Sequence, residues 1–381
     1  MTVLRKLWLL FAQACTLCLA VLFVVATLRP DLLGRAGTHE IGVVLRQETT
    51  TPVTASAITS HADAAKKAMP AVVNIYTSKE VRSRSPLADD ATMRRYFPGL
   101  AERMPPQRVT SLGSGVIVAP EGFVLTNYHV IQGADDIQLV LNDGRRFAAR
   151  VRGVDPDSDL AVLKAEQDGL PAITFGAIER VQVGDTVLAI GNPFGLGNTV
   201  TSGIVSALGR NHLGINSFED FIQTDAAINL GNSGGALVDA AGNMIGINSM
   251  IYSQSGGSMG IGFAIPVSIA RNVLEQIIRD GEVTRGWLGI GPQDLSYELA
   301  QSIAVEGVVV RDIVRGGPAD KAGIRVKDVI VDIDGKPTRD TPALLARIAE
   351  LPPGNVVKVR IVRDKAAQEV DVTVGKRPKA Q

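Results

Sequence analysis

The chain has 381 residues, of which 45% are hydrophobic and 20% are charged. This length exceeds one ordinary domain, and the composition is that of a folded protein rather than a disordered one. Lys plus Arg and Asp plus Glu both total 39, so the formal net charge is zero and binding to nucleic acid is not expected. The 39 glycines fall between short apolar, β-branched runs, which favours a mainly β body.

An apolar segment follows Arg5 and Lys6, and residues 7–28 contain no charge. A stretch of about 20 apolar residues can cross a bilayer as a helix, and the preceding cations keep the N-terminus in the cytoplasm. The alternative is a cleaved signal peptide, whose apolar core is usually only about 7–15 residues long. We therefore predict a cytoplasmic stub and transmembrane anchor over residues 1–30.

Both cysteines, Cys15 and Cys18, lie inside this apolar segment. Neither a flanking His nor a βαβ pattern accompanies them, so we interpret them as small apolar residues rather than as a redox or metal pair. No structural disulfide, metal or other cofactor is expected.

The remaining chain divides into a linker and two domains. Residues 31–70 are polar without sustained periodicity, and residues 78–109 form a second long polar stretch that we interpret as a loop. Short strands separated by turn signals then run to a helix over residues 266–278. We expect a larger β domain over 71–281 and a smaller domain of strands and two short helices over 282–377. The strands of the first domain are predicted at 72–76, 115–119, 123–126, 136–141, 146–155, 160–165, 186–190, 203–208, 221–224, 236–238 and 244–248.

The glycine-rich run Gly231-Asn232-Ser233-Gly234-Gly235 is the candidate nucleophile turn. A serine hydroxyl needs a base to remove its proton and preorganised donors to receive the oxyanion. Glycines on both sides allow a tight turn that exposes the hydroxyl and directs the backbone N–H groups of Gly231 and Ser233 into one hollow. An ordinary glycine-rich turn that happens to contain a serine is the alternative.

The candidate base is His129, which directly follows an apolar strand that could hold its ring. His212 is the alternative, but it lies in a turn between glycines. The orienting carboxylate should precede a buried strand, as Asp159 does, whereas Asp155 and Asp157 belong to a turn next to Pro156. The chain order His, Asp, Ser matches that of chymotrypsin-type proteases.

Three stretches around these residues resemble the signatures of the HtrA (Deg, or Do-like) serine proteases: residues 126–130 (TNYHV), 158–164 (SDLAVLK) and 231–237 (GNSGGAL). The resemblance implies a chymotrypsin-like double β-barrel with His129, Asp159 and Ser233 as the triad and Gly231, Asn232 and Ser233 at the oxyanion hole. In trypsin-like enzymes the residue about six before the serine lies at the base of the substrate pocket. Here it is Ala227, and with Ile228 it suggests a small apolar P1 side chain.

The second domain resembles a PDZ domain. Residues 285–290 (RGWLGI) are similar to its carboxylate-binding loop, which implies that Trp287, Leu288, Gly289 and Ile290 bind the C-terminal residues of a peptide. One anchor, one protease domain and one PDZ domain resemble the membrane-anchored, single-PDZ branch of the family, the DegS and AlgW type. Arg210 stands in the loop whose arginine relays the peptide signal in these relatives.

This resemblance implies a single-pass protein of the bacterial inner membrane with its catalytic domain in the periplasm, assembled as a homotrimer. The implied partners are outer-membrane protein C-termini at the PDZ domain and, as substrate, a membrane anti-sigma factor in envelope stress signalling. A general quality-control protease that degrades unfolded envelope proteins is the alternative. A catalytically silent PDZ scaffold is a third possibility, against which the intact triad argues.

Overall fold

The computed structural model describes residues 8, 13, 60–81, 107–192, 197–211, 213, 214, 216, 218–229, 231–251, 257–296 and 305–378. The predicted anchor lies almost wholly outside the described residues, as do most of the predicted linker and loop. Among the described residues, no helix is both long enough and apolar enough to cross a membrane.

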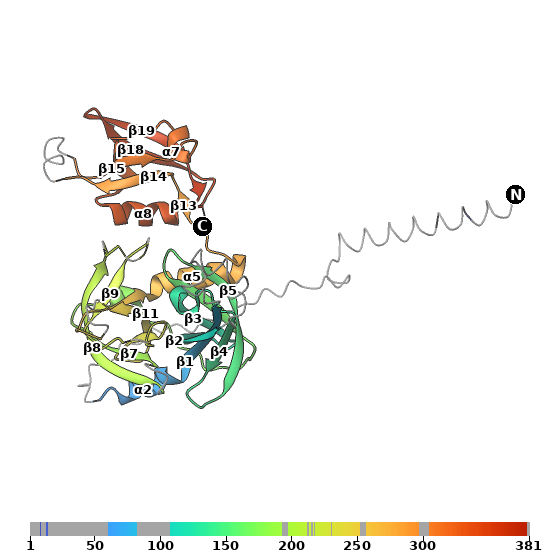
Figure 1. The fold of residues 1–381 in the computed structure, drawn as a ribbon. Coiled ribbons are helices and arrows are strands. Elements are labelled where there is room, and N and C mark those ends of the chain that lie inside the picture. Colours follow the sequence, from blue (N-terminus) through green and yellow to red (C-terminus); the bar gives the residue numbers. More distant parts are fainter. Residues whose placement is uncertain are drawn as a thin grey trace, which may run out of the picture. The chain divides into compact units, whose positions relative to one another are not determined.

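Two closed six-stranded barrels form the first domain (Figure 1). The first barrel has the strand order β1-β2-β3-β6-β5-β4, and every neighbouring pair is antiparallel. Alternate apolar residues such as Ile75, Ile117 and Leu163 point into its core and are fully buried. Its strands are β1 Val72–Val81, β2 Gln107–Ala119, β3 Phe123–Asn127, β4 Asp136–Val140, β5 Arg146–Asp155 and β6 Leu160–Ala165.

The second barrel has the order β10-β11-β12-β9-β8-β7, with Leu237, Ile222 and Val205 in its core. Its closing strand, Gly262–Pro266, was absent from the strands predicted from the sequence. Gly260, Gly262 and Pro266 interrupt the apolar pattern in and just before this strand. Pairing with neighbouring strands on both edges nevertheless holds it in place. The strands are β7 Thr186–Gly191, β8 Thr199–Arg210, β9 Phe221–Thr224, β10 Ala236–Asp239, β11 Met244–Ile251 and β12 Gly262–Pro266.

Two strands extend beyond their predicted bounds, and one helix lies in the predicted linker. The strands β1 and β2 continue to Val81 and from Gln107, because they pair residue for residue as a long antiparallel ribbon. The helix α2, Ala62–Ala68, occupies the end of the predicted linker, which corrects that prediction. Ala64 and Ala68 are buried on one of its faces, and Lys67 Nζ donates a hydrogen bond of 2.6 Å to Asn243 Oδ1.

The helix α5, Val267–Asp280, follows the second barrel as predicted. Val273, Leu274 and Ile277 lie on one stripe at helical spacing and are buried. Gly281 ends the helix with φ of 79°, a left-handed conformation that glycine adopts without a steric penalty. A short 3₁₀ turn, Met69–Ala71, and another, Ile178–Arg180, complete the described helical segments of this domain, together with α4, Tyr128–Ile131.

The second domain has a sheet of order β14-β15-β16-β18-β19 with β17 paired to β16, and a small sheet of β13 with β20. The helix α8 packs Leu344 and Ile348 into its core. Residues 356–374 form a hairpin with a two-residue turn at Asp364 and Lys365, both of positive φ, as a type I′ turn requires. The elements are β13 Gly286–Trp287, β14 Ile290–Asp294, β15 Val308–Ile313, α7 Pro318–Lys321, β16 Val329–Ile333, β17 Lys336–Pro337, α8 Thr341–Glu350, β18 Val356–Arg363, β19 Ala366–Thr373 and β20 Gly375–Lys376.

Candidate active site

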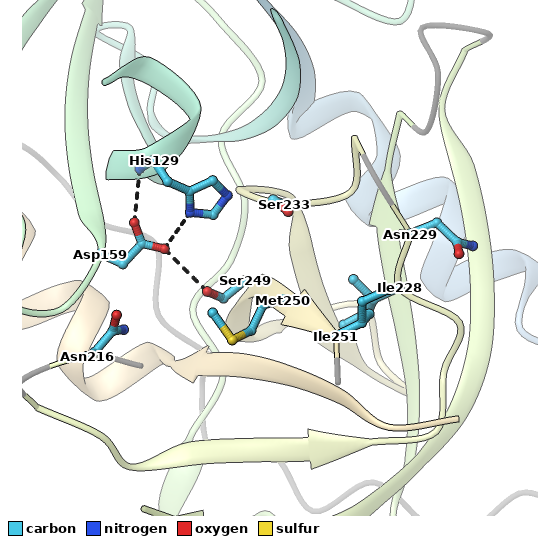
Figure 2. Close-up of a pocket in the computed structure, with 9 residues that line it drawn as sticks. All are labelled: His129, Asp159, Asn216, Ile228, Asn229, Ser233, Ser249, Met250 and Ile251. Carbon is cyan, nitrogen blue, oxygen red and sulfur yellow. Dashed lines mark hydrogen bonds and ion pairs between the residues drawn. The ribbon is translucent and has the colours of Figure 1, made fainter. Parts of the chain in front are cut away.

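His129 lies in the single turn α4, directly after the fully buried strand β3. Its ring nitrogen Nδ1 is 2.7 Å from Oδ2 of Asp159, and its backbone N–H donates to Oδ1 of the same carboxylate over 2.9 Å. The two bonds fix both the position and the rotation of the carboxylate (Figure 2). The His129 side chain keeps 44% of its surface exposed while Asp159 keeps 10%, so the ring is reachable from solvent and its partner is not.

Asp159 holds an unusual backbone conformation, with φ of 56° between β5 and β6. Few non-glycine residues adopt this region, and the surroundings must hold them there. Its carbonyl accepts hydrogen bonds of 3.0 Å from the backbone N–H of Tyr128 and from Asn127 Nδ2. The strand end that carries His129 therefore holds the backbone of Asp159 as well as its side chain.

The two rival carboxylates have other partners. Asp155 forms an ion pair with Arg285 and accepts a hydrogen bond from Ser158 Oγ, and Asp157 pairs with Arg377 over 3.0 Å. The structure therefore brings Asp159, and neither neighbour, to His129. The other candidate base, His212, lies outside the described residues.

Ser233 lies in the turn between β9 and β10 of the second barrel. Gly231 and Gly234 have φ of 99° and 84°, which explains the glycines on both sides of the serine. The N–H groups of Gly231 and Ser233 donate to no backbone carbonyl of the described residues.

His129, Asp159 and Ser233 line one cavity of about 440 Å³. Ser233 lies beside the imidazole ring in Figure 2, although no hydrogen bond joins the two side chains. Catalytic hydrogen bonds are often long in a ligand-free site and shorten when substrate binds. The remaining lining residues are Asn216, Ile228, Asn229, Ser249, Met250 and Ile251.

The apolar part of this cavity differs from the predicted pocket in one residue. Ile228, Met250 and Ile251 line it, as the apolar character predicted for this pocket requires, whereas Ala227 is not among the lining residues. The Ala227 carbonyl instead accepts hydrogen bonds from Thr201 Oγ1 at 2.8 Å and from Asn232 Nδ2 at 3.4 Å. A count along the sequence does not reveal which side of the turn faces the cavity.

Ser249 was not predicted from the sequence. It is buried in β11, and its hydroxyl donates to Asp159 Oδ2 over 3.4 Å, a third hydrogen bond to this carboxylate. A serine within an apolar strand carries no local signal of such a role. The pairing register of β11 shifts between Asn248 and Met250, and Ser249, Met250 and Ile251 all line the cavity, so simple alternation along the strand would not have placed it there.

Arg210 stands at the end of β8 and is exposed. Its Nε donates a 2.8 Å hydrogen bond to Oε1 of Gln223 on the neighbouring strand. Arg210 is not among the residues that line the cavity. In this state, therefore, it contacts a barrel strand rather than the Ser233 turn.

The predicted peptide-binding residues of the second domain surround the start of β14, an edge strand of its sheet. Trp287, Leu288, Gly289 and Ile290 line a small hollow together with Leu345 and Ile348 of α8. The side chain of Leu288 is only 1% exposed and also belongs to the core. Gly289 has φ of 75°, so the loop places its backbone where a side chain would be strained.

Family models agree with this architecture. Residues 113–247 match the trypsin-like peptidase domain, and residues 286–374 match the PDZ domain. Among solved structures, the HtrA-type protease AlgW with a decapeptide is 49% identical, with a TM-score of 0.74 over 84% of this chain and 100% of that chain. The serine endoprotease from Yersinia pestis is 40% identical, with a TM-score of 0.63 over 85% of this chain and 100% of that chain.

The curated relatives are also described as serine endoproteases. A probable periplasmic serine endoprotease, DegP-like, from Chlamydia trachomatis is 48% identical over 76% of this chain, which spans only 60% of that relative. A protein of the same description from Ectopseudomonas mendocina is 43% identical over 82% of this chain and 70% of the relative. On this similarity, and with a trypsin-like fold that carries a histidine–aspartate pair beside a glycine-flanked serine, the chain belongs to the HtrA-type, DegP-like family of serine endoproteases.

Proposed function

We propose that this chain is a serine endopeptidase in which Ser233 is the nucleophile, His129 the general base and Asp159 the carboxylate that orients the base. The observation that carries the proposal is the 2.7 Å contact between His129 Nδ1 and Asp159 Oδ2 at a cavity that Ser233 also lines. This contact leaves Nε2 as the ring nitrogen available to the serine hydroxyl.

The chemistry follows from this arrangement. Ser233 Oγ attacks the scissile carbonyl as Nε2 of His129 takes its proton, and Asp159 stabilises the imidazolium that forms. The N–H groups of Gly231 and Ser233, with the Asn232 peptide between them, are proposed to receive the oxyanion. The imidazolium then gives its proton to the leaving amine, and water hydrolyses the acyl-enzyme by the same steps in reverse.

We further propose that substrates present a small or medium apolar side chain to the cavity. Ile228, Met250 and Ile251 supply its apolar surface, and the described lining contains no cation and no acid besides Asp159, which is engaged by His129. A substrate lysine or arginine would therefore enter without a carboxylate partner, and burial of an unpaired charge is costly.

The second domain is proposed to bind the C-terminal residues of a peptide as an added strand beside β14. An edge strand has unpaired backbone groups on one side, and the loop before it, residues 285–290, can offer its N–H groups to a carboxylate. AlgW structures similar to this chain contain a decapeptide or a tripeptide, which supports peptide binding in this family.

The finer proposal is a membrane-anchored periplasmic protease that senses misfolded outer-membrane protein C-termini and cleaves a membrane anti-sigma factor. Its support is the uncharged segment 7–28, the single PDZ match and the likeness to AlgW. A homotrimer in the inner membrane, with the protease in the periplasm, belongs to the same proposal. The DegP-like names of the curated relatives favour the second candidate, a general periplasmic quality-control protease.

The deciding experiment reconstitutes the full chain in detergent and measures cleavage of a membrane anti-sigma factor and of unfolded casein. Each is tested with and without peptides that end in an aromatic residue. The sensor proposal predicts peptide-stimulated cleavage of the anti-sigma factor and little cleavage of casein. Cleavage of casein at an equal rate without peptide would contradict it and support quality control.

Two variants test the nucleophile and the relay residue separately. Ser233→Ala should abolish both cleavages and labelling by a fluorophosphonate probe, and residual turnover would overturn the nucleophile assignment. Arg210→Ala should lower peptide-stimulated turnover far more than peptide affinity measured by calorimetry, because a relay residue acts after binding. Unchanged stimulation would remove Arg210 from the account and leave the protease assignment standing.

A further inference from the structure

A buried serine in the first barrel contacts the nucleophile turn of the second. Ser114 lies in β2 and has no exposed surface. Its backbone N–H donates to the carbonyl of Ser233 over 2.9 Å, and its Oγ donates to the carbonyl of Gly231 over 2.6 Å. One residue therefore holds the two carbonyls that flank the catalytic turn.

Ser114 is itself held from two sides. Its hydroxyl oxygen accepts a 2.9 Å hydrogen bond from the backbone N–H of Asn192, at the end of β7. Its carbonyl accepts a 2.7 Å hydrogen bond from Oγ1 of Thr126, three residues before His129. The residue thus connects the strand end that carries the base to the turn that carries the nucleophile, and its hydroxyl hydrogen is directed towards Gly231.

These bonds restrict the rotation of the peptide units in the turn. The Gly231 carbonyl is held by Ser114 Oγ, and the N–H of the same peptide, on Asn232, donates to Asn229 over 3.0 Å. The Asn232 carbonyl accepts from Gly235 over 2.9 Å. The N–H of Ser233 belongs to the same peptide as the Asn232 carbonyl. Because this peptide and the one before it are both held, the Ser233 N–H keeps one direction.

Gly231 gains from such a restraint because no Cβ limits its backbone. It has φ of 99° and no side chain, so rotation of its peptide meets little steric resistance. The close fit around the turn agrees with a fixed geometry, because a Cβ on Gly234 would lie 2.1 Å from the carbonyl oxygen of Ser114.

We propose that Ser114 is a positioning residue that keeps the oxyanion hole preformed, with its hydroxyl acting through the Gly231 carbonyl. This inference rests on the proposed function of Ser233 and its neighbouring N–H groups. Because the oxyanion exists only in the transition state, loss of the restraint lowers kcat and leaves substrate binding unchanged. Removal of a whole oxyanion donor lowers kcat by about 10²–10³-fold, so a loosened donor should cost about 10–100-fold.

The test compares Ser114→Ala with Thr126→Val in the full chain. Both variants remove one buried hydroxyl, but the Thr126 hydroxyl donates to the carbonyl of Ser114 rather than to a carbonyl of the turn. Ser114→Ala should lower kcat about 10–100-fold at unchanged KM. It should also weaken the binding of a peptide boronate by a similar factor, because the adduct of the boronate with Ser233 is a tetrahedral anion. Thr126→Val should change both by less than about 3-fold, because its lost bond does not reach Gly231.

A merely structural role predicts a different result: equal losses in both variants that follow their unfolding temperatures. That result, or an unchanged kcat in folded Ser114→Ala, would overturn the proposal. Ser114→Cys keeps the side-chain shape with a weaker donor, so kcat should fall in the order wild type, Cys, Ala, and any other order contradicts the role of the hydroxyl. Fluorophosphonate labelling of Ser233 in the wild type separates this failure from failure of the proposed function.

Discussion

The ion pair between Arg285 and Asp155 allows a quantitative test of how the turn before Asp159 is held. Arg285 follows α5, and its side chain is 12% exposed while that of Asp155 is 4% exposed. A second contact joins Arg285 Nη2 to Asp155 Oδ2 over 2.6 Å, so the pair is bidentate. Arg285 also lies 4.6 Å from the ring centroid of Phe218.

Arg285→Ala leaves the Asp155 carboxylate buried without its counter-charge. Breaking a buried pair by removing one partner costs about 3–5 kcal/mol in the free energy of unfolding. Asp155 keeps the hydrogen bond from Ser158 Oγ, so we expect the lower end, about 3 kcal/mol. For a domain of this size 1 kcal/mol corresponds to about 2–4 °C, which gives a Tm lower by about 6–12 °C.

Thermal unfolding followed by circular dichroism measures this shift, with Arg150→Ala as the matched control. Arg150 pairs with Glu166, but the two side chains are 84% and 50% exposed, so its loss should cost about 0–1 kcal/mol. Asp155→Asn combined with Arg285→Ala should recover part of the loss, because no charge then remains buried. An Arg285→Ala Tm within the range of the Arg150 control would refute this reasoning.

Three further predictions concern the site and the core. Gly234→Ala should lower turnover and fluorophosphonate labelling by more than about 100-fold, because its Cβ would lie 2.1 Å from the carbonyl oxygen of Ser114 at φ of 84°. The control is Gly257→Ala, whose Cβ has open space around it. Equal activity of the two variants would contradict this prediction. Ser249→Ala should lower kcat about 3–10-fold at unchanged KM, since it removes one of three hydrogen bonds to the Asp159 carboxylate; a change in KM alone would contradict the assignment. Leu344→Ala should lower the free energy of unfolding of the second domain by about 2–5 kcal/mol in a denaturant titration and abolish peptide binding, while a loss below about 1 kcal/mol would mean that the α8 core is not as closely packed as described.

The features that could be predicted from the sequence are those with a local physical cause. His129 follows an apolar strand and Asp159 precedes one, so rigid elements hold both side chains, and the glycines around Ser233 indicate positive φ. The two-barrel protease and the PDZ domain likewise follow from motifs within short stretches. The anchor over residues 7–28 remains a prediction, because it falls outside the described residues.

The features that were missed depend on partners distant in the sequence. Ser114 and Ser249 are single serines in strands, and their roles arise from contacts with residues 117 and 90 positions away. The strand β12 is defined by its neighbours rather than by its own residues, and α2 buries only two alanines. Ala227 was placed by motif position, which fixes the order of residues but not the direction in which each side chain points.

The division of the site between two barrels has a consequence for biosynthesis. The first barrel supplies His129 and Asp159, while the second supplies Ser233 and closes only with Gly262–Pro266. A nascent chain that ends anywhere before this strand therefore carries a base and an acid without a positioned nucleophile. The site therefore cannot be complete until nearly the whole protease domain has been translated.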